Sequence, residues 1–183
     1  AMGHVTYGML VSVDGFIADP DGRITLPVPG AELHRYFNER QRESSLAIYG
    51  RRMWDVMRYW GEPDPDRDEV ADEFAREWAR TPKVVCSASL AAAPDGVTLI
   101  ASDAVAAVRR LKSETDGEIE VSGASLAGSI GAAGLIDEFR LFVQPVVLGR
   151  GIPYFADGFR PELRFVGSEA LPQGVVLNRY APR

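Results

Sequence analysis

The turn Ser122-Gly123-Ala124 has the residue types of a phosphate-binding turn. It follows the β-branched, apolar run Ile119 to Val121, which is typical of a buried strand, and a helical pattern begins near Ala124. The first amides of such a helix have no intrahelical partner and lie at the positive end of the helix dipole, so they can bind a pyrophosphate. The G-x-G-x-x-G fingerprint is absent, however, and small residues also suit tight packing of a helix on a sheet. Both interpretations stay open for the turn alone.

The same segment also approximates the G-x-S-x-G turn that exposes a nucleophilic serine, here Ser125. A serine nucleophile needs a histidine base, which in the usual chain order of this motif follows it. The two histidines, His4 and His34, both precede Ser125. The order argues against a hydrolase, and we expect Ser125 to cap the helix or to contact a ligand.

A second candidate anion site lies at Gly50-Arg51-Arg52. The short apolar strand Leu46 to Tyr49 precedes it, and a helix is expected from about Met53 to Tyr59. Arginine binds phosphate through paired hydrogen bonds, whereas two cations in the first turn of a helix are unfavourable when no anion is near. The pair therefore favours a phosphate site, with a solvated surface pair as the alternative.

Composition restricts the class of protein. A chain of 183 residues with 46% hydrophobic residues predicts one globular domain over residues 2–183 that needs no structural metal. The net charge of −6 argues against nucleic-acid or anionic-membrane partners. Because we find neither a membrane-spanning run nor a signal-peptide pattern, we expect a cytoplasmic protein. The single cysteine, Cys86, lies in the apolar segment Lys83 to Ser87 and is expected in the core.

Strand and helix patterns alternate along the chain, with a long loop up to Gly30 after turns at Asp14-Gly15 and Asp19 to Gly22. The helices are predicted at 31–42, 53–59, around 70–78, at 103–113 with Ser102 as N-cap, and from about 124. The strands are predicted at 5–13, 46–49, 83–87, 97–101, 119–121, 137–147, 163–168 and 175–180. The alternation predicts a mixed sheet flanked by helices.

Three motifs, in this order and spacing, resemble the dihydrofolate-reductase-like superfamily, and most closely its RibD C-terminal-domain branch. The resemblance runs from about Val5 to Tyr180. It implies an α/β fold with three layers, α/β/α, around a mixed, mostly parallel central sheet of about eight strands. It also implies NADPH across the carboxyl edge of the sheet, and a homodimer. The motifs are Ser12-Val13-Asp14-Gly15-Phe16-Ile17-Ala18, Gly50-Arg51-Arg52-Met53-Trp54, and Gly134-Leu135-Ile136-Asp137-Glu138 with Pro145-Val146-Val147-Leu148-Gly149-Arg150-Gly151.

The resemblance assigns cofactor contacts residue by residue. Leu10 and Ile17 match backbone positions that hold the nicotinamide carboxamide, and the turn at Gly50, Arg51 and Arg52 matches a phosphate-binding turn. An arginine near a 2′-phosphate is a physical reason to favour NADP over NAD. The contacts to the adenosine ribose and its 2′-phosphate fall on Ser87, Ala88 and Ser89. The contacts to the pyrophosphate fall on Gly123, Ala124, Ser125 and Leu126.

The chain departs from the pattern at two positions of the cofactor site. Met53 stands where classical reductases have a threonine, which removes a hydroxyl that could bond the cofactor. Gly123 is flanked by Ser122 and Ala124 where the family has paired glycines, so added side-chain atoms limit the approach of a ligand to the backbone.

Classical reductases bind the substrate ring through a carboxylate on a helix, and the matching position in this chain falls nearest Glu32. The alternative is that Glu32 only complements the helix dipole. Asp14 is a second candidate catalytic residue, with a turn-shaping role as its alternative. We expect His34 at the surface, and no functional role is assigned to the tryptophans, which are Trp54, Trp60 and Trp78.

The resemblance implies an NADPH-dependent reductase that transfers hydride from nicotinamide C4 to a pyrimidinone or pterin-like substrate, as 5-amino-6-(5-phosphoribosylamino)uracil reductase of riboflavin biosynthesis does. One cysteine cannot furnish the zinc site of the deaminase to which that reductase is fused. The alternative is a non-catalytic nucleotide-binding or scaffold dimer with the same fold. The pattern of Phe139, Leu141 and Val143 suits either a dimer interface or the core.

Overall fold

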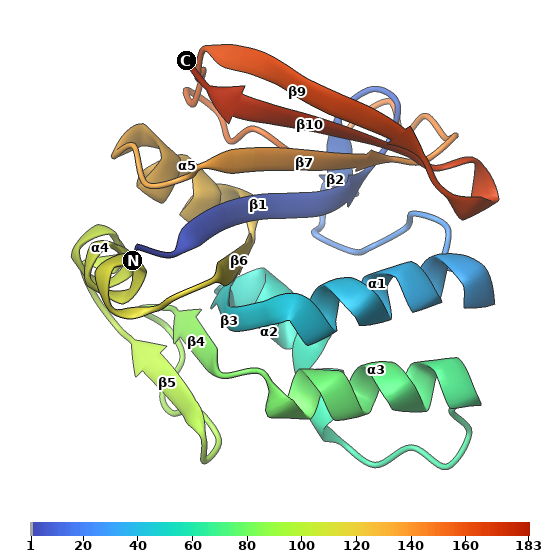
Figure 1. Cartoon of the computed structure of the whole chain (residues 1–183), viewed down its shortest axis with the longest axis horizontal. Helices are drawn as coiled ribbons and strands as arrows, with labels where there is room; N and C mark the ends of the chain where they lie inside the picture. Colours follow the sequence, from blue (N-terminus) through green and yellow to red (C-terminus); the bar gives the residue numbers. More distant parts are fainter. Residues whose placement is uncertain (1) are drawn as a thin grey trace.

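The computed structural model describes residues 2–183, and its centre is an eight-stranded sheet with the order β5-β4-β3-β6-β1-β7-β10-β9 (Figure 1). Neighbouring strands are parallel from β5 to β7, and β10 is antiparallel to both β7 and β9. A small second sheet pairs β2 (Phe16–Ala18) with β8 (Ile152–Pro153). The other strands are β1 (His4–Val11), β3 (Ser44–Gly50), β4 (Lys83–Cys86), β5 (Val97–Ile100), β6 (Glu118–Ser122), β7 (Glu138–Val143), β9 (Leu163–Ala170) and β10 (Val176–Pro182).

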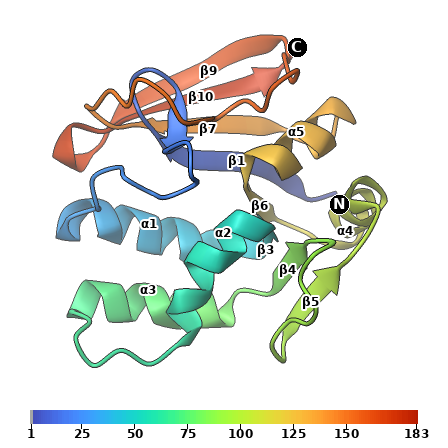
Figure 2. The ribbon, with the colours of Figure 1, turned by 180° about the vertical axis from the view of Figure 1, so that it is seen from behind.

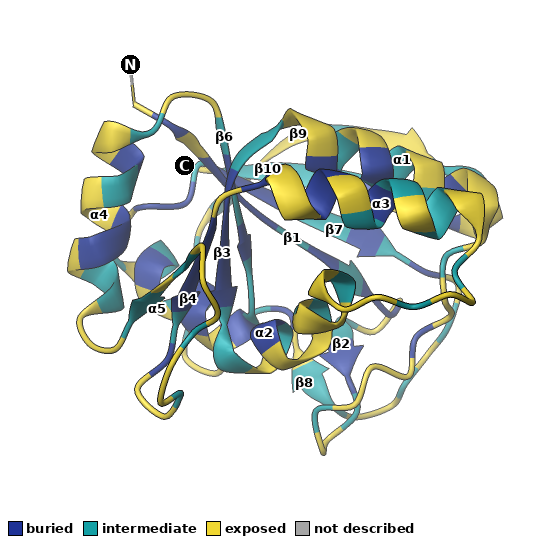
Figure 3. Ribbon diagram, turned by 90° about the horizontal axis from the view of Figure 1, so that it is seen from below, coloured by how far each residue is buried: buried dark blue, intermediate teal, exposed yellow. Residues whose placement is uncertain are grey.

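Helices cover both faces of the sheet, so the predicted three-layer α/β/α architecture is confirmed (Figures 2 and 3). On one face lie α1 (Ala31–Glu43), α3 (Glu69–Arg80) and α2 (Arg51–Met57), which continues as a 3-10 turn, η1 (Arg58–Gly61). On the other face lie α4 (Ala104–Glu114) and α5 (Ala124–Ala132). A second 3-10 turn, η2 (Pro172–Gly174), precedes β10.

The two faces of the sheet follow from the alternation of side chains along each strand. In β1 the odd-numbered residues enter the main core with α4 and α5, whereas Leu10 packs with Phe37 of α1 and Phe142 of β7. In the main core, Tyr7 and Tyr154 stack at a ring-centroid distance of 4.3 Å. Each of these two hydroxyls donates a hydrogen bond of 2.7 Å to the backbone carbonyl of the other residue, so both buried hydroxyls are satisfied.

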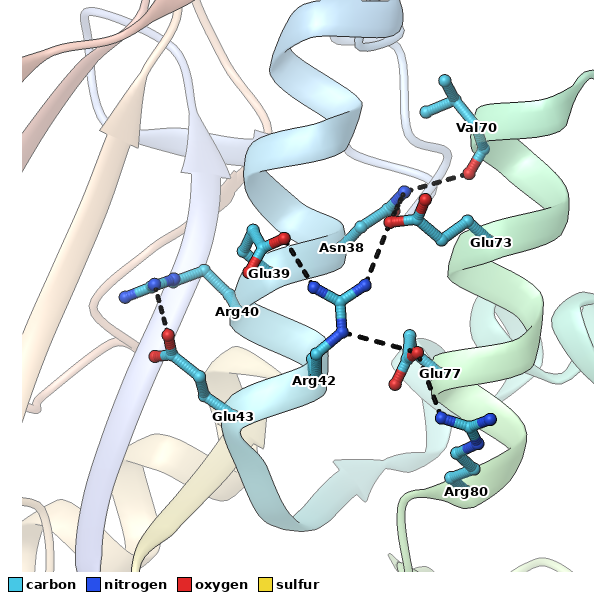
Figure 4. Close-up of polar contacts among 9 residues, drawn as sticks. All are labelled: Asn38, Glu39, Arg40, Arg42, Glu43, Val70, Glu73, Glu77 and Arg80. Atoms are coloured by element: carbon cyan, nitrogen blue, oxygen red, sulfur yellow. Dashed lines mark hydrogen bonds and ion pairs between the residues drawn. The ribbon is translucent and has the colours of Figure 1, made fainter.

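Polar side chains join α1 to α3 (Figure 4). The buried Asn38 amide donates to the Val70 carbonyl at 3.0 Å, and Arg42 lies between the two helices with Glu73 at 3.2 Å and Glu77 at 3.5 Å. These contacts fix the position of α1, whose opposite side faces the sheet and the candidate site.

Several element boundaries differ from the sequence prediction. The N-cap of α4 is Asp103, not Ser102, because the Asp103 carboxylate accepts a hydrogen bond from the Ala106 amide at 3.2 Å. The first strand ends at Val11 because the chain turns at Ser12, whose carbonyl accepts from the Gly15 amide at 3.0 Å. The strand predicted to run to Val147 ends at Val143, shortly before Pro145, which has no amide to donate.

The apolar pattern on β7 belongs to the core. Phe139 is almost completely buried, and Leu141 and Val143 pack against the same cluster. Within residues 2–183, no helix has the length and apolar character needed to span a bilayer, and no group of three or more histidine, cysteine or acidic side chains is placed to hold a metal ion.

Candidate nucleotide and substrate site

A groove follows the carboxyl edge of the parallel strands and consists of three compartments that share lining residues. The inner compartment, which we call the cleft, has a volume of about 600 Å³. The middle and outer compartments have volumes of about 410 Å³ and about 430 Å³. Ile17 and Met53 line both the cleft and the middle compartment, and Gly50 and Ser125 line both the middle and the outer one. An extended ligand can therefore occupy all three.

The middle compartment is built by two strand-to-helix turns that touch each other. Gly123 has φ +121°, a conformation that side-chain-bearing residues rarely adopt. A Cβ atom at Gly123 would lie 3.4 Å from both the amide nitrogen and the Cα of Gly50, so the close approach of the two turns depends on this glycine. No side chain caps the N-terminus of α5, whose cap position is Gly123. The predicted alternative in which Ser125 caps the helix is therefore wrong, and Ser125 is exposed to the groove instead.

The two arginines diverge from the start of α2. Arg51 lines the middle and outer compartments, where its guanidinium donates to the Ser89 hydroxyl at 3.1 Å and contacts Asp55 at 3.2 Å. Arg52 lines the middle compartment, and its guanidinium fills the space beside Gly22 in the long loop before α1. Both cations therefore border the compartment that the first amides of α5 also border, which suits a bound phosphate.

The outer compartment starts where β4 ends. Ser87, Ala88 and Ser89 line it, and the Ser87 hydroxyl accepts hydrogen bonds from the Ser89 amide at 3.2 Å and the Leu90 amide at 3.1 Å, which fixes the turn. Cys86 lines the same compartment and is only partly buried, so it is less enclosed than predicted. Burial raises the pKa of its thiol to about 11, which keeps the sulfur protonated and unreactive at neutral pH.

The cleft is mainly apolar, with a few polar groups among its lining residues. Leu10 and Ile17 line it together with Trp60, for which no role is predicted. His34 also lines the cleft, so the prediction of a surface histidine is wrong. Its Nδ1 lies 3.0 Å from the Asn38 side-chain oxygen, and its ring meets Trp60 and Phe74 edge-on at 5.8 and 5.3 Å.

Glu120 is a cleft residue that the sequence prediction missed. It lies on β6 two residues before Ser122 and lines the cleft together with Arg40 of α1. Burial, and then the nearby Glu118 carboxylate, raise the pKa of Glu120 to about 7, while the Arg140 and Arg40 guanidinium groups lower it. The sequence carried one signal, the alternation of Glu118, Glu120 and Ser122 with buried Ile119 and Val121. That pattern places the three side chains on one face of a strand but does not indicate a cleft above that face.

The two predicted catalytic carboxylates lie elsewhere. Glu32 is exposed at the start of α1 and is not among the residues that line the groove. The Asp14 carboxylate accepts hydrogen bonds from the Ser12 hydroxyl at 2.6 Å and from the Leu148 and Gly149 amides at 3.1 and 2.7 Å. The first of these bonds makes the largest contribution to lowering the pKa of Asp14. Asp14 thus ties the turn before β2 to the loop before β8, and neither carboxylate is among the residues that line the groove.

The twelve residues predicted to bind the cofactor, in contrast, all line the groove, although they come from five separate segments of the chain. Leu10 and Ile17 lie in the cleft, the phosphate candidates in the middle compartment, and the adenosine candidates in the outer one. The full set is Leu10, Ile17, Gly50, Arg51, Arg52, Ser87, Ala88, Ser89, Gly123, Ala124, Ser125 and Leu126. Their order along the groove is the order of nicotinamide, phosphates and adenosine in an extended dinucleotide.

Comparison with known proteins supports the same fold. The family model described as RibD C-terminal domain matches residues 3–177. The uncharacterized protein YyaP of Bacillus subtilis (strain 168) is 30% identical over 182 residues, which cover 97% of this chain and 94% of YyaP. A putative riboflavin biosynthesis protein from Shewanella sp. PV-4 superposes with a TM-score of 0.75 at 20% identity, over 98% of this chain and 99% of that one. Dihydrofolate reductase from Enterococcus faecalis, in a complex with NADP(H), superposes with a TM-score of 0.64 at 14% identity, over 98% of this chain and 96% of that one.

Proposed function

Because the chain belongs to the RibD C-terminal domain family, we propose that it is an NADPH-dependent reductase of a small heterocyclic substrate. The observation that carries the proposal is the continuous groove, in which all twelve predicted cofactor residues meet. The Enterococcus faecalis reductase, which shares the fold, was solved with NADP(H). The cofactor of this chain is inferred from that likeness and from the residues of the groove.

The residues of the groove fit the parts of the cofactor. The first amides of α5 and the guanidinium groups of Arg51 and Arg52 hold the phosphates, since all of them are hydrogen-bond donors that line the middle compartment, and the Arg51 guanidinium keeps its contacts to Asp55 and Ser89 beside them. Ser89, already bonded to Arg51, lies on the adenosine side and completes a site for a 2′-phosphate. Leu10 and Ile17 hold the nicotinamide ring against the apolar wall of the cleft.

The bound cofactor supplies a hydride from its nicotinamide C4. The protein places the substrate ring in the remaining part of the cleft, where apolar side chains keep water away from the reacting atoms. The substrate class that fits the family and the polar groups of the cleft is a pyrimidinone or a pterin-like ring.

Cofactor binding is tested by titrating the protein with NADPH and, separately, with NADH while tryptophan fluorescence is recorded. Trp60 lines the cleft, so a nicotinamide ring bound there changes its emission. We expect saturable binding of NADPH in the micromolar range and weaker binding of NADH. No change in emission up to hundreds of micromolar NADPH contradicts the proposal.

A second candidate function, a non-catalytic nucleotide-binding dimer, is favoured by one observation. A Cβ atom at Gly123 would lie 3.9 Å from Cγ of Met53, so the Met53 side chain lies beside the phosphate turn, where classical reductases have a threonine. This candidate predicts NADPH binding by a dimer, measured by sedimentation, without oxidation of NADPH in the presence of any pyrimidinone or pterin. Turnover of one such compound rules it out.

A further inference from the structure

The sheet face beneath α1 carries a chain of paired polar side chains. The Thr6 hydroxyl donates to the Glu118 carboxylate at 2.9 Å, and Arg140 contacts Glu118 at 3.0 Å and Glu138 at 2.6 Å. Arg179 contacts the second oxygen of Glu138 at 3.2 Å. Each charged group of this row therefore has a partner of opposite charge, as buried or half-buried charges require.

Glu120 lies on the same face and is left out of the row. Within residues 2–183, its carboxylate accepts no hydrogen bond and forms no ion pair. Its neighbours across the strands are Thr6, whose hydroxyl is bonded to Glu118, and Ala47, which has no polar side chain. An unpaired carboxylate in a half-buried position costs folding free energy, and a ligand that donates a hydrogen bond to it would recover that cost.

Arg40 supplies the complementary unpaired group. Its Nη2 donates to Glu43 at 2.9 Å, but its Nε is buried and has no partner among the described residues. Arg40 leaves α1 on the side away from α3, whereas Arg42 lies between the two helices (Figure 4). A buried guanidinium N–H without an acceptor is rare in folded proteins, so it indicates a site for a ligand acceptor.

Glu120 and Arg40 line the same recess at one end of the cleft. The recess has a volume of about 120 Å³, and its apolar walls are Phe37 and Phe142. This volume is close to the roughly 150 Å³ of a cavity that accommodates one benzene ring, so one six-membered ring or its edge fits. Leu10, a predicted nicotinamide contact, lines both the recess and the cleft.

We propose that Glu120 and Arg40 bind the lactam edge of a flat heterocycle, with the ring N–H donating to the Glu120 carboxylate and the adjacent carbonyl accepting from Arg40 Nε. The two unpaired groups are one acceptor and one donor in one recess, which is the complement of an adjacent N–H and C=O pair. This inference rests on the proposed function for the position of the ring beside the nicotinamide, and it narrows the substrate class to rings with a free lactam, such as pyrimidinones.

The test uses two probes, 5-aminouracil and 5-amino-1,3-dimethyluracil, which differ only in the ring N–H groups. Each probe is titrated calorimetrically into the NADPH-loaded protein at pH 8. We expect the wild type to bind 5-aminouracil at least about tenfold more tightly than the dimethyl compound, because hydrogen bonds to a charged group are strong. E120Q should weaken the binding of 5-aminouracil about tenfold and remove most of the difference in affinity between the two probes. Arg40→Met should weaken the binding of 5-aminouracil to a similar extent.

Glu39→Gln is the matched control. Glu39 lies on the exposed side of α1, beside Arg42 and outside the recess. Its replacement by glutamine removes one negative charge, as the replacement of Glu120 by glutamine does. We expect E39Q to bind both probes as the wild type does.

The pH dependence gives a second readout. The groups that face Glu120 are Glu118 on the same strand, Arg140 on β7, Arg40 on α1 and, more weakly coupled, Tyr49 on β3. Because the ionised carboxylate is a stronger acceptor for the ring N–H than the protonated carboxyl group, the affinity for 5-aminouracil should rise as the pH passes upward through about 7. E120Q should flatten this rise.

The inference and the proposed function fail in different ways. If E120Q and R40M bind NADPH and 5-aminouracil as the wild type does, the inference is wrong and the proposed function stands. Wild-type protein that binds NADPH but neither probe also contradicts the inference. Failure of the wild type to bind NADPH contradicts the proposed function itself.

Discussion

The unpaired carboxylate of Glu120 makes the stability of the cofactor-free protein depend on pH. The folded state raises the pKa of this group from its usual 4.5 to about 7, so between these values the folded state holds a proton that the unfolded state releases. The stabilising contribution of the protonated form is complete below about pH 4.5 and is lost as the pH rises through 7.

The magnitude follows from the pKa difference. At about 1.4 kcal/mol per pH unit, the difference between 4.5 and about 7 corresponds to an upper value of about 3 kcal/mol at pH 8. Because Glu120 is only half-buried, solvent weakens this effect, and we expect about 2 kcal/mol. For a chain of 183 residues this is about 4 to 8 °C in the unfolding temperature.

The perturbation is Glu120→Gln, which removes the titrating group and keeps its shape. Thermal unfolding followed by circular dichroism should give E120Q and the wild type the same unfolding temperature at pH 4 and a higher one for E120Q at pH 8. All other titrating groups are common to both proteins, so the difference isolates Glu120. E39Q serves as the control and should follow the wild type. A difference in unfolding temperature between E120Q and the wild type that is the same at pH 4 and at pH 8 would show that Glu120 does not titrate with a raised pKa in the folded state.

Three further predictions concern the groove and the core. Gly123→Ala forces a residue with a side chain into a φ of +121° and places its Cβ 3.4 Å from the backbone of Gly50. We expect this substitution to lower the free energy of unfolding by about 1–3 kcal/mol and to abolish the thermal stabilisation by NADPH. Melting curves recorded with and without NADPH measure both effects. Arg51→Gln should reduce the preference for NADPH over NADH about tenfold in fluorescence titrations, and an unchanged ratio contradicts the 2′-phosphate assignment. Tyr7→Phe leaves the backbone carbonyl of Tyr154 without its hydrogen-bond donor and should lower the free energy of unfolding, measured by urea titration, by about 1–2 kcal/mol. A loss smaller than a few tenths of a kcal/mol would mean that this hydrogen bond contributes little to stability.

The sequence predicted the layers of the fold because the strands and helices carry strong, regular patterns. Ile119 and Val121 alternate with polar neighbours and are buried, and Val70, Phe74 and Trp78 repeat at helical spacing on α3, where Phe74 and Trp78 are buried. The boundaries were less predictable, since they depend on single bonds. Asp103 rather than Ser102 caps α4 because only the aspartate carboxylate accepts from the Ala106 amide.

The family resemblance, together with the local chemistry of the turns at Gly50 and Gly123, assigned residues to the cofactor side of the candidate site, and all of these residues line the groove. The substrate side proposed above was not predicted from the sequence. The polar groups proposed for it come from Glu120 of β6 and Arg40 of α1, and no local pattern indicates that these two side chains lie in the same recess. Glu32 was a candidate because of its place on a helix, with a helix-dipole role as the alternative, and the structure shows it exposed at the start of α1.

We propose that the groove binds NADPH with its phosphates at the start of α5 and its nicotinamide in the cleft. A crystal structure of the protein at saturating NADPH measures this directly. We expect density for the pyrophosphate within hydrogen-bond distance of the amides of Ala124 to Leu126 and for the nicotinamide ring against Leu10 and Ile17. Clear density for the cofactor at any other surface, or a groove without density when NADPH is saturating, contradicts it.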